Sequence, residues 1–332
     1  MAEYHIIYLN AILSPKLCIM TTTCSPQLPE SASLSKSPSL SSVRRAIHTA
    51  YLFSRDNIKD ITCLGFVFGA LNASVSSRLS MGPDRSFNQI LASAPWMILW
   101  SSSNLFLFNL HNQRHSASVA EDRLNKPWRP LPSGRITPEQ TTRVMYYMYP
   151  VIILVSLVSG GLGPCLFEAF LCLWYNEWGG ASDPFLKNLL NGLGFACFLA
   201  GPLEVATKQS VFSGEGKAAA WLFMLAVSIT TTSHTQDFRD MEGDKATGRN
   251  TVPLVIGDMK ARLSVALGVI LWNCTACWFW GGAWKAGTLA WITGLAMAGN
   301  LFWNRSREGD VFTWKLWPFW MFGLFVLPAS MK

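Results

Sequence analysis

The stretch "ILASAPWMILWSSSNLFLFNL", residues 90–110, contains no charged residue. A run of about 20 mostly apolar residues is long enough to cross the hydrocarbon core of a bilayer as an α-helix. Lipid offers no hydrogen-bond partners, and a helix satisfies the backbone groups of one segment internally. This stretch therefore predicts a membrane-spanning helix.

Similar apolar runs recur along the chain, which has 332 residues, of which 50% are hydrophobic and only 14% charged. A soluble domain normally carries about a quarter charged residues, and a membrane β-barrel would show short alternating segments. We therefore expect an all-α polytopic membrane protein. The nine candidate spans lie near residues 58–78, 88–110, 140–160, 161–178, 185–206, 216–234, 261–283, 285–303 and 312–330.

Basic residues are distributed unevenly between the two predicted faces of this bundle. Of the 27 Lys and Arg residues, 21 fall in the N-terminal segment and near the loops that follow the even-numbered spans. Because Lys and Arg are enriched on the cytoplasmic side of membrane proteins, this face is expected in the cytosol. The net charge of +7 then reflects membrane orientation and an anionic ligand, and no nucleic-acid partner is expected.

The loop after the sixth span contains "DFRDMEGDKATGRNTVP", residues 237–253. On an α-helix, Asp237, Asp240 and Asp244 would share one face because they are three and seven positions apart. Three carboxylates on one face repel each other unless a cation joins them. Hard oxygen ligands favour Mg²⁺, which keeps some of its waters and is often shared with substrate phosphates. The spacing therefore predicts a magnesium site.

The loop after the second span lies on the same predicted face and contains "VAEDRLNKPWRPLPSGRITPEQ", residues 119–140. Its acidic pair, Glu121 and Asp122, precedes several basic residues, and ammonium and guanidinium groups bind phosphate oxygens directly. Together the two loops predict a site for a magnesium-bound diphosphate, with its hydrocarbon tail among the aromatic-rich helices. The candidate diphosphate-binding residues are Lys126, Arg129, Arg135, Lys245 and Arg249. Glu121 fits an ordinary solvated loop equally well, and Lys245 fits a purely topological role.

Two motifs resemble those of the UbiA prenyltransferase superfamily, over residues 48–330. "DRLNKPWRPLPSGRIT", residues 122–137, is similar to the segment that follows the first Asp-rich motif of that family. "DFRDMEGDKATGRNTVP" resembles the second motif, DxxDxxxD followed by Gly-Arg-x-Thr-x-Pro. The resemblance implies a nine-helix bundle with a central cavity, which binds a prenyl diphosphate through Mg²⁺ and ionises its allylic C–O bond.

The first motif departs from the family pattern NDxxDxxxD. Anchored on Asp122, the pattern places its Asn on Arg114 and its middle Asp on Ser118. With two residues inserted, Asn112 supplies the Asn, and Gln113 replaces the following Asp. In both alignments only Asp122 matches cleanly among the acids.

This departure, together with the upstream stretch "HTAYLFSRDNIKDITCLGFVFG" (residues 48–69), is most similar to fungal membrane-bound terpene cyclases of the superfamily. The resemblance implies cyclisation of farnesyl or geranylgeranyl diphosphate to a terpene hydrocarbon in secondary metabolism. The expected Mg²⁺ ligands are Asp122, Asp237, Asp240 and Asp244, with Asn112 and Glu121 as further candidates.

A carbocation intermediate must be protected from water, and aromatic faces stabilise cations by roughly 0.5–2 kcal/mol each. The candidates for this lining are Tyr146, Tyr147, Trp221 and Phe223, although any one of them also fits a lipid-facing or helix-packing role. Glu168 and Glu204 lie within predicted spans, where an acid is costly and often functional. Either one could accept the proton that ends the reaction, or lie near a membrane interface.

Two rival functions share these features. An acceptor-dependent prenyltransferase, acting on an aromatic or polyketide acceptor, would use the same metal ligands. A transporter or a non-catalytic membrane scaffold would tolerate charged loops, but the ordered Asp spacing argues against it.

The expected organisation is a disordered tail rich in Ser, Pro and Thr (residues 1–45) followed by a transmembrane domain (residues 46–332). We expect a multi-pass protein of the endoplasmic reticulum, with membrane lipid and the prenyl diphosphate as its partners and with no obligate protein partner.

Overall fold

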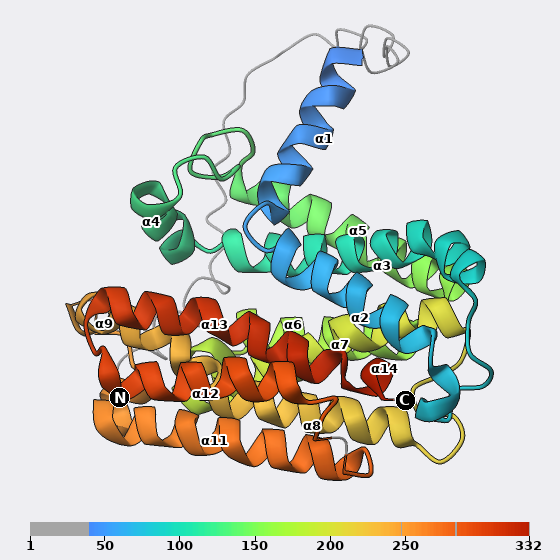
Figure 1. Cartoon of the computed structure of the whole chain (residues 1–332). Coiled ribbons are helices and arrows are strands. Elements are labelled where there is room, and N and C mark those ends of the chain that lie inside the picture. Colours follow the sequence, from blue (N-terminus) through green and yellow to red (C-terminus); the bar gives the residue numbers. More distant parts are fainter. Residues whose placement is uncertain (1–39, 247, 283, 332) are drawn as a thin grey trace, which may run out of the picture. The chain divides into compact units, whose positions relative to one another are not determined.

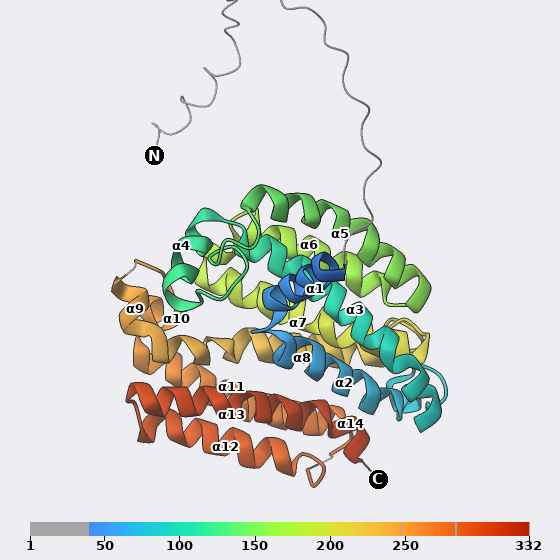
Figure 2. The same ribbon diagram turned by 90° about the horizontal axis from the view of Figure 1, so that it is seen from above.

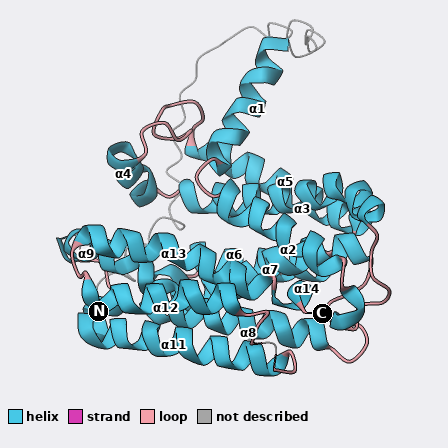
Figure 3. Cartoon of the chain, in the orientation of Figure 1, coloured by secondary structure: helices cyan, strands magenta, loops and turns pink. Residues whose placement is uncertain are grey.

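The computed structural model describes residues 40–246, 248–282 and 284–331. The chain divides into two units, Met1–Val43 and Arg44–Lys332, and the expected disordered tail lies almost wholly outside the described residues. The fold below is that of the second unit. Its described residues form helices, turns and loops without any strand (Figure 3), which confirms the all-α prediction.

The helical elements are α1 (Leu40–Ser54), η1 (Ile58–Cys63), α2 (Leu64–Ala73), η2 (Ser76–Leu79), α3 (Phe87–Gln113), α4 (Ser116–Asn125), α5 (Pro138–Ser159), α6 (Leu162–Asn176), η3 (Gly180–Ser182), α7 (Pro184–Thr207), α8 (Lys217–Thr232), η4 (Ser233–Asp240), α9 (Met241–Ala246), α10 (Val252–Ile256), α11 (Asp258–Phe279), α12 (Thr288–Trp303), α13 (Arg307–Phe325) and α14 (Leu327–Ser330).

Each predicted span coincides with helical structure. The first is divided into a π-helical turn, η1, the α-helix α2 and the 3-10 turn η2; the others correspond to α3, α5, α6, α7, α8, α11, α12 and α13. Among the described residues, four helices are long and apolar enough to span a membrane by composition alone, namely α3, α5, α7 and α11. The nine-span topology therefore stays a prediction.

Helix starts follow local signals in the sequence. Ser86 and Gln89 form a reciprocal capping box at the start of α3, and Thr137 and Gln140 form another at α5. The Asp183 carboxylate accepts two backbone N–H groups at the start of α7. Each of these side chains satisfies amide groups that would otherwise lack a partner in the first helical turn.

Helix α7 lies at the centre of the bundle and packs against α2, α3, α6 and α8 (Figures 1 and 2). Its approach to α3 requires Gly201, because a Cβ atom there would lie 2.2 Å from the ring of Trp100. The Trp100 indole N–H donates a hydrogen bond to the Gly161 carbonyl oxygen (3.2 Å), which ties α3 to the start of α6. Helix α11 packs against α8 and η4, α13 packs against η4, and α12 packs against α11 and α13.

A tight hairpin joins α5 and α6 at the stretch "GGLG", residues 160–163. Gly160 and Gly161 have φ angles of 99° and 82°, a region that favours glycine. The hairpin returns α6 to the end of the bundle where α3 finishes. There Asn112, near the end of α3, donates a hydrogen bond to Asn176 (3.2 Å), so the ends of α3 and α6 meet at one end of the bundle.

Candidate active site

A cavity of about 920 Å³ is lined mainly by residues of η1, α2, α3, α4, α6, α7, α8, η4, α9 and α13. This volume is within the range of about 300–1,000 Å³ that is usual for ligand pockets. Its carboxylates come mainly from the segments that follow α3 and α8, whereas most of its apolar side chains come from the long helices. The main apolar lining residues are Leu64, Leu105, Phe108, Leu190, Phe195, Phe198, Ile229, Trp314 and Trp317.

The second motif begins in a 3-10 helix, η4, and not in the expected α-helix. Asp237 and Asp240 still fall on one side of the helix, because three residues complete a turn of 3-10 helix. The chain becomes α-helical again in α9, which carries Asp244. All three carboxylates line the cavity, as their spacing predicts, although the local helix type differs.

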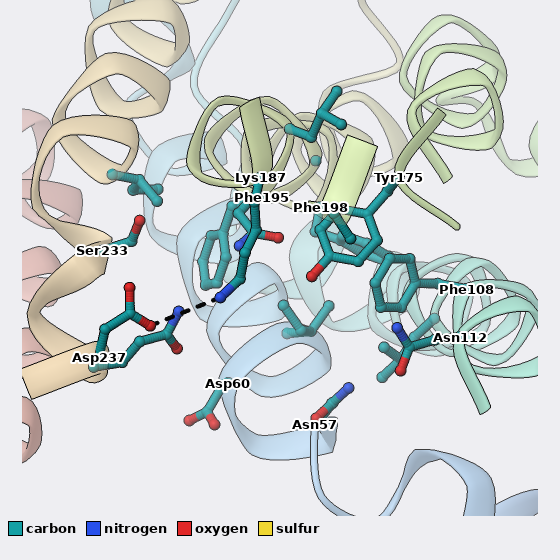
Figure 4. Close-up of a pocket in the computed structure, with 18 of the residues that line it drawn as sticks. Asn57, Asp60, Phe108, Asn112, Tyr175, Lys187, Phe195, Phe198, Ser233 and Asp237 are labelled. Atoms are coloured by element: carbon teal, nitrogen blue, oxygen red, sulfur yellow. Dashed lines mark ion pairs between the residues drawn. The ribbon is translucent and has the colours of Figure 1, made fainter. Parts of the chain in front are cut away.

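A buried ion pair joins the second motif to α7. The Lys187 ammonium lies 3.7 Å from an Asp237 carboxylate oxygen, and both side chains are less than 10% exposed (Figure 4). Burial raises the pKa of Asp237, and the nearby carboxylates of Asp244 and Asp240 raise it further, while Lys187 opposes the shift. These acids therefore lie close enough to interact, in a setting that favours added positive charge.

Asp244 and Asp240 have basic neighbours of their own. Arg249 lies 3.6 Å from Asp244 and also lines the cavity. Burial raises the pKa of Asp244, and Arg249 opposes this shift. Asp240 is half-exposed and accepts a hydrogen bond from the Arg239 guanidinium at 3.1 Å. The second motif thus presents acids and cations together at the cavity.

The first motif is held by a second buried ion-pair network. Asp122 in α4 accepts two hydrogen bonds from Arg129, at 3.1 and 2.8 Å. The same guanidinium donates to Asp56 at 3.1 and 3.0 Å, and Lys126 lies 3.6 Å from Asp56. Arg129 therefore closes the loop after α4 onto the segment before η1, and its donors face carboxylates.

Asn112 and Glu121 also line the cavity, whereas Gln113 does not. The side chain of Gln113 is buried and donates a hydrogen bond to the Phe53 carbonyl oxygen at 2.8 Å. In the alignment with two inserted residues, the position that the family fills with Asp thus holds an amide that fastens α3 to α1. The first motif contributes only two carboxylates to the cavity lining.

The second motif rests on a buried network between α11 and α13. Arg262 donates two hydrogen bonds to Asp310, at 2.6 and 2.8 Å, and a third to Asp258 at 2.7 Å. Its guanidinium carbon lies 4.5 Å from the centroid of the Phe238 ring. Because Phe238 immediately follows Asp237, this network supports the backbone that carries the motif.

Several predicted residues lie elsewhere. Arg135 and Lys245 are exposed and do not belong to the cavity lining. The predicted aromatic lining also needs correction: Tyr146, Tyr147 and Phe223 expose about two thirds of their surface outside the cavity. Trp221 is fully buried, but it packs against Phe279 and Trp280 and not around the cavity.

The structure also supplies site residues that sequence reasoning missed. Phe108, Phe195 and Phe198 form much of the aromatic wall (Figure 4), and Lys187 and Asp56 provide ion-pair partners for the two motifs. Lys187 carried no distinct signal, because a lysine near the end of a membrane helix ordinarily extends its ammonium group to the interface. The aromatic residues carried none, because aromatic side chains occur on many faces of these helices.

Oxygen donors in this site suit a hard divalent cation. Within residues 40–246, 248–282 and 284–331, no three His, Cys, Asp or Glu side chains converge closely enough to hold a metal ion. These acids nevertheless fit Mg²⁺, since the carboxylates of Asp240 and Asp244 both disfavour ionisation of Asp237, and an added cation would offset this repulsion.

Residues 79–326 match the model of the UbiA prenyltransferase family, and the chain belongs to this family. It is therefore a helical membrane protein of an enzyme family whose members act on prenyl diphosphates.

The particular relatives include both cyclases and transferases. The chain is 31% identical, over 85% of its length, to 92% of the fumagillin beta-trans-bergamotene synthase of Aspergillus fumigatus. Two proteins of Hericium erinaceus are also similar: a diterpene cyclase (32% identity, 55% of this chain, 57% of the relative) and a polyprenyl transferase (33%, 53% and 59%).

A solved structure concerned with digeranylgeranylglyceryl phosphate synthase in membranes superposes with a TM-score of 0.63 at 18% identity. The superposition covers 86% of this chain and 99% of that one. This likeness supports the UbiA-type helical fold.

Proposed function

We propose that this protein is a membrane-bound terpene cyclase that converts farnesyl or geranylgeranyl diphosphate into a cyclic hydrocarbon and releases diphosphate. The observation that carries the proposal is the composition of one cavity. Acidic and basic side chains from the two motifs line it together with aromatic and aliphatic side chains of α3 and α7. A diphosphate with a long apolar chain needs both kinds of surface.

The polar part of the cavity is suited to hold the diphosphate and its counterion. Lys126, Lys187 and Arg249 line it and can donate to phosphate oxygens. Asp237, Asp240 and Asp244, together with Asp122, would hold Mg²⁺. When bound, the ion would neutralise negative charge that develops on the leaving diphosphate.

The apolar part is suited to hold the prenyl chain and to exclude water from a carbocation. Each buried CH₂ group contributes about 0.8 kcal/mol to binding, so a long chain gains substantial affinity here. The rings of Phe108, Phe195 and Phe198 line this part. A cation beside an aromatic face is stabilised by roughly 0.5–2 kcal/mol. A folded chain also presents its own double bonds at high effective concentration.

Two observations favour cyclisation over transfer to an acceptor. Gln113 is turned toward Phe53, so the altered first motif contributes few carboxylates. A terpene synthase is also similar to this chain over most of both proteins. Prenyl transfer to an aromatic or polyketide acceptor is the second candidate, because a polyprenyl transferase is 33% identical over about half of the chain.

We further propose that the protein lies in the endoplasmic reticulum membrane with the cavity's charged end facing the cytosol. The support for this orientation is the basic asymmetry of the sequence, in which 21 of 27 Lys and Arg residues fall on the same predicted side as the two motifs.

Membranes that contain the protein should be incubated separately with farnesyl and geranylgeranyl diphosphate, with and without Mg²⁺ and without any acceptor. The expected result is a cyclic hydrocarbon together with one equivalent of diphosphate, only when Mg²⁺ is present. If neither substrate gives a product, and a prenylated product forms once a phenolic acceptor is added, the transferase function would replace the cyclase function.

A matched pair of variants tests the metal site within the same experiment. Asp240→Ala removes a half-exposed cavity carboxylate, and we expect turnover to fall by about 10²-fold or more. Glu242→Ala removes an exposed acid of α9 that lies outside the cavity lining, and should leave turnover near that of the wild type. Equal activity in the two inserted variants would remove Asp240 from the proposed site.

A further inference from the structure

One face of α6 lines the cavity and contains an acid that the diphosphate site does not use. Glu168, Leu171, Cys172 and Tyr175 all belong to the lining, at the three-, four- and seven-residue spacings of one helical face. Glu168 is only 2% exposed. Its Oε2 atom is buried and has no hydrogen-bond partner within the described chain.

Glu168 lies deeper in the bundle than the charged end of the cavity. The end of α6 meets α3 through the hydrogen bond between Asn112 and Asn176. Glu168 precedes Tyr175 by seven residues, which corresponds to about 10 Å along the helix axis. The carboxyl group is therefore separated from the motif acids and faces the part of the cavity in which the hydrocarbon chain would lie.

An unpartnered carboxyl group at this depth needs a physical reason. Burial of a polar atom without a hydrogen bond costs roughly 1–3 kcal/mol in proteins, and an isolated charge costs more. A cavity wall built for apolar packing alone would be more stable with Leu or Met at this position. A transient positive charge in the cavity would give the carboxylate a partner during the reaction.

The second acid within a predicted span, Glu204, provides a contrast. Its Oε1 atom accepts a hydrogen bond from the Val211 backbone N–H at 2.8 Å, and it lies outside the cavity lining. Glu204 therefore fastens the end of α7 to the following turn. Of the two acids, only Glu168 lies where a substrate could reach it.

We infer that Glu168 is the base that ends cyclisation by taking a proton from the final carbocation. This role rests on the proposed cyclase function. The carboxylate forms an O–H bond with a proton on the carbon beside the cationic centre. The electrons of the broken C–H bond become the π bond of the product, which leaves a neutral hydrocarbon and a neutral Glu168. The acid then returns its proton to water after the product leaves.

Glu168→Gln keeps the size and polarity of the side chain but cannot accept the proton. The experiment compares diphosphate release and hydrocarbon products from farnesyl and geranylgeranyl diphosphate, for the wild type and for purified, membrane-inserted variants. Diphosphate release should stay within about tenfold of the wild type, because ionisation occurs at the motif acids. Formation of the native hydrocarbon should fall by about 10²-fold, with alcohols or other alkenes in its place.

Two further variants distinguish a base from a structural residue. Glu168→Asp keeps a carboxylate, so the share of hydrocarbon among its products should exceed that of Glu168→Gln. Glu204→Gln alters a buried acid outside the cavity and should keep the product profile of the wild type.

Three outcomes would overturn the assignment. One is an unchanged hydrocarbon profile in Glu168→Gln, and another is an equal loss of diphosphate release and hydrocarbon in the Gln and Asp variants. The third is a wild type that releases no diphosphate from either substrate, which would overturn the proposed function as well. If the wild type makes the hydrocarbon and Glu168→Gln gives the same products, only the assignment of Glu168 would be overturned, and the proposed cyclase function would stand.

Discussion

Replacement of Asp310 by Ala should destabilise the protein by about 3 kcal/mol, because it breaks the buried ion pair below the second motif. Arg262 and Asp310 are 2% and 3% exposed and share hydrogen bonds of 2.6 and 2.8 Å. Removing one member of a buried pair costs about 3–5 kcal/mol. We expect the lower end, because Asp258 still accepts a hydrogen bond from Arg262 at 2.7 Å.

Thermal unfolding of the detergent-solubilised protein measures this effect. About 3 kcal/mol corresponds to a drop in apparent melting temperature of roughly 6–12 °C for a domain of a few hundred residues. A fixed heating rate is needed, because membrane proteins of this size often unfold irreversibly. The matched control is Arg305→Ala, whose half-exposed side chain pairs with Asp258 at 2.6 Å and should contribute less than about 1 kcal/mol.

The double variant Arg262→Met/Asp310→Leu removes both charges and should recover much of the lost stability, since apolar replacements of buried pairs are often neutral or stabilising. Equal melting temperatures for Asp310→Ala and Arg305→Ala would refute this reasoning. A double variant less stable than Asp310→Ala would show that the charges themselves are needed.

Three further predictions concern the site and its orientation. Lys187→Met leaves the buried Asp237 without its cation and should lower turnover by about 10²-fold, whereas Lys187→Arg, which keeps the charge, should retain more activity in the same product assay. Burial raises the pKa of Asp237 and Asp244 above the ordinary value of 3.8, so protons compete with metal at higher pH than for exposed carboxylates. The affinity for Mn²⁺, measured by magnetic resonance, should therefore fall as pH decreases. In Lys187→Met this fall should begin at a still higher pH, because Lys187 lowers the pKa of Asp237. Reporters fused to the two ends of the chain should lie on opposite sides of the membrane, with the N-terminus cytosolic, and detection on one side would contradict the odd number of spans.

The helices were predictable because their signals are local. Apolar runs gave their positions, and capping residues such as Ser86 and Thr137 begin α3 and α5 as their sequences indicate. The location of the motif acids at one cavity followed from topology, since both loops follow even-numbered spans. The 3-10 geometry of η4 did not follow, because the packing of Phe238 on Arg262 is a contact between distant segments.

The aromatic wall was not predictable from one sequence. Lipid and the protein interior are both apolar, so the hydrophobic pattern of a membrane helix does not reveal which face lines a cavity. Tyr146 and Tyr147 on α5 and Phe195 and Phe198 on α7 therefore carry similar signals, yet only the second pair lines the cavity. The partners of Asp122 and Asp237 depend in the same way on helix packing.

The charged groups in and beside the cavity are already paired before any ligand binds, as the fixed charges of an ion-exchange resin hold their counterions. Four basic side chains each face an acid: the pairs are Lys126–Asp56, Arg129–Asp122, Lys187–Asp237 and Arg249–Asp244. A divalent cation that binds alone would displace ammonium or guanidinium groups and leave them without partners. A diphosphate that binds alone would draw those basic groups away and leave the carboxylates without partners. When both arrive together, every displaced charge finds a new partner, so each should strengthen the binding of the other by the same factor.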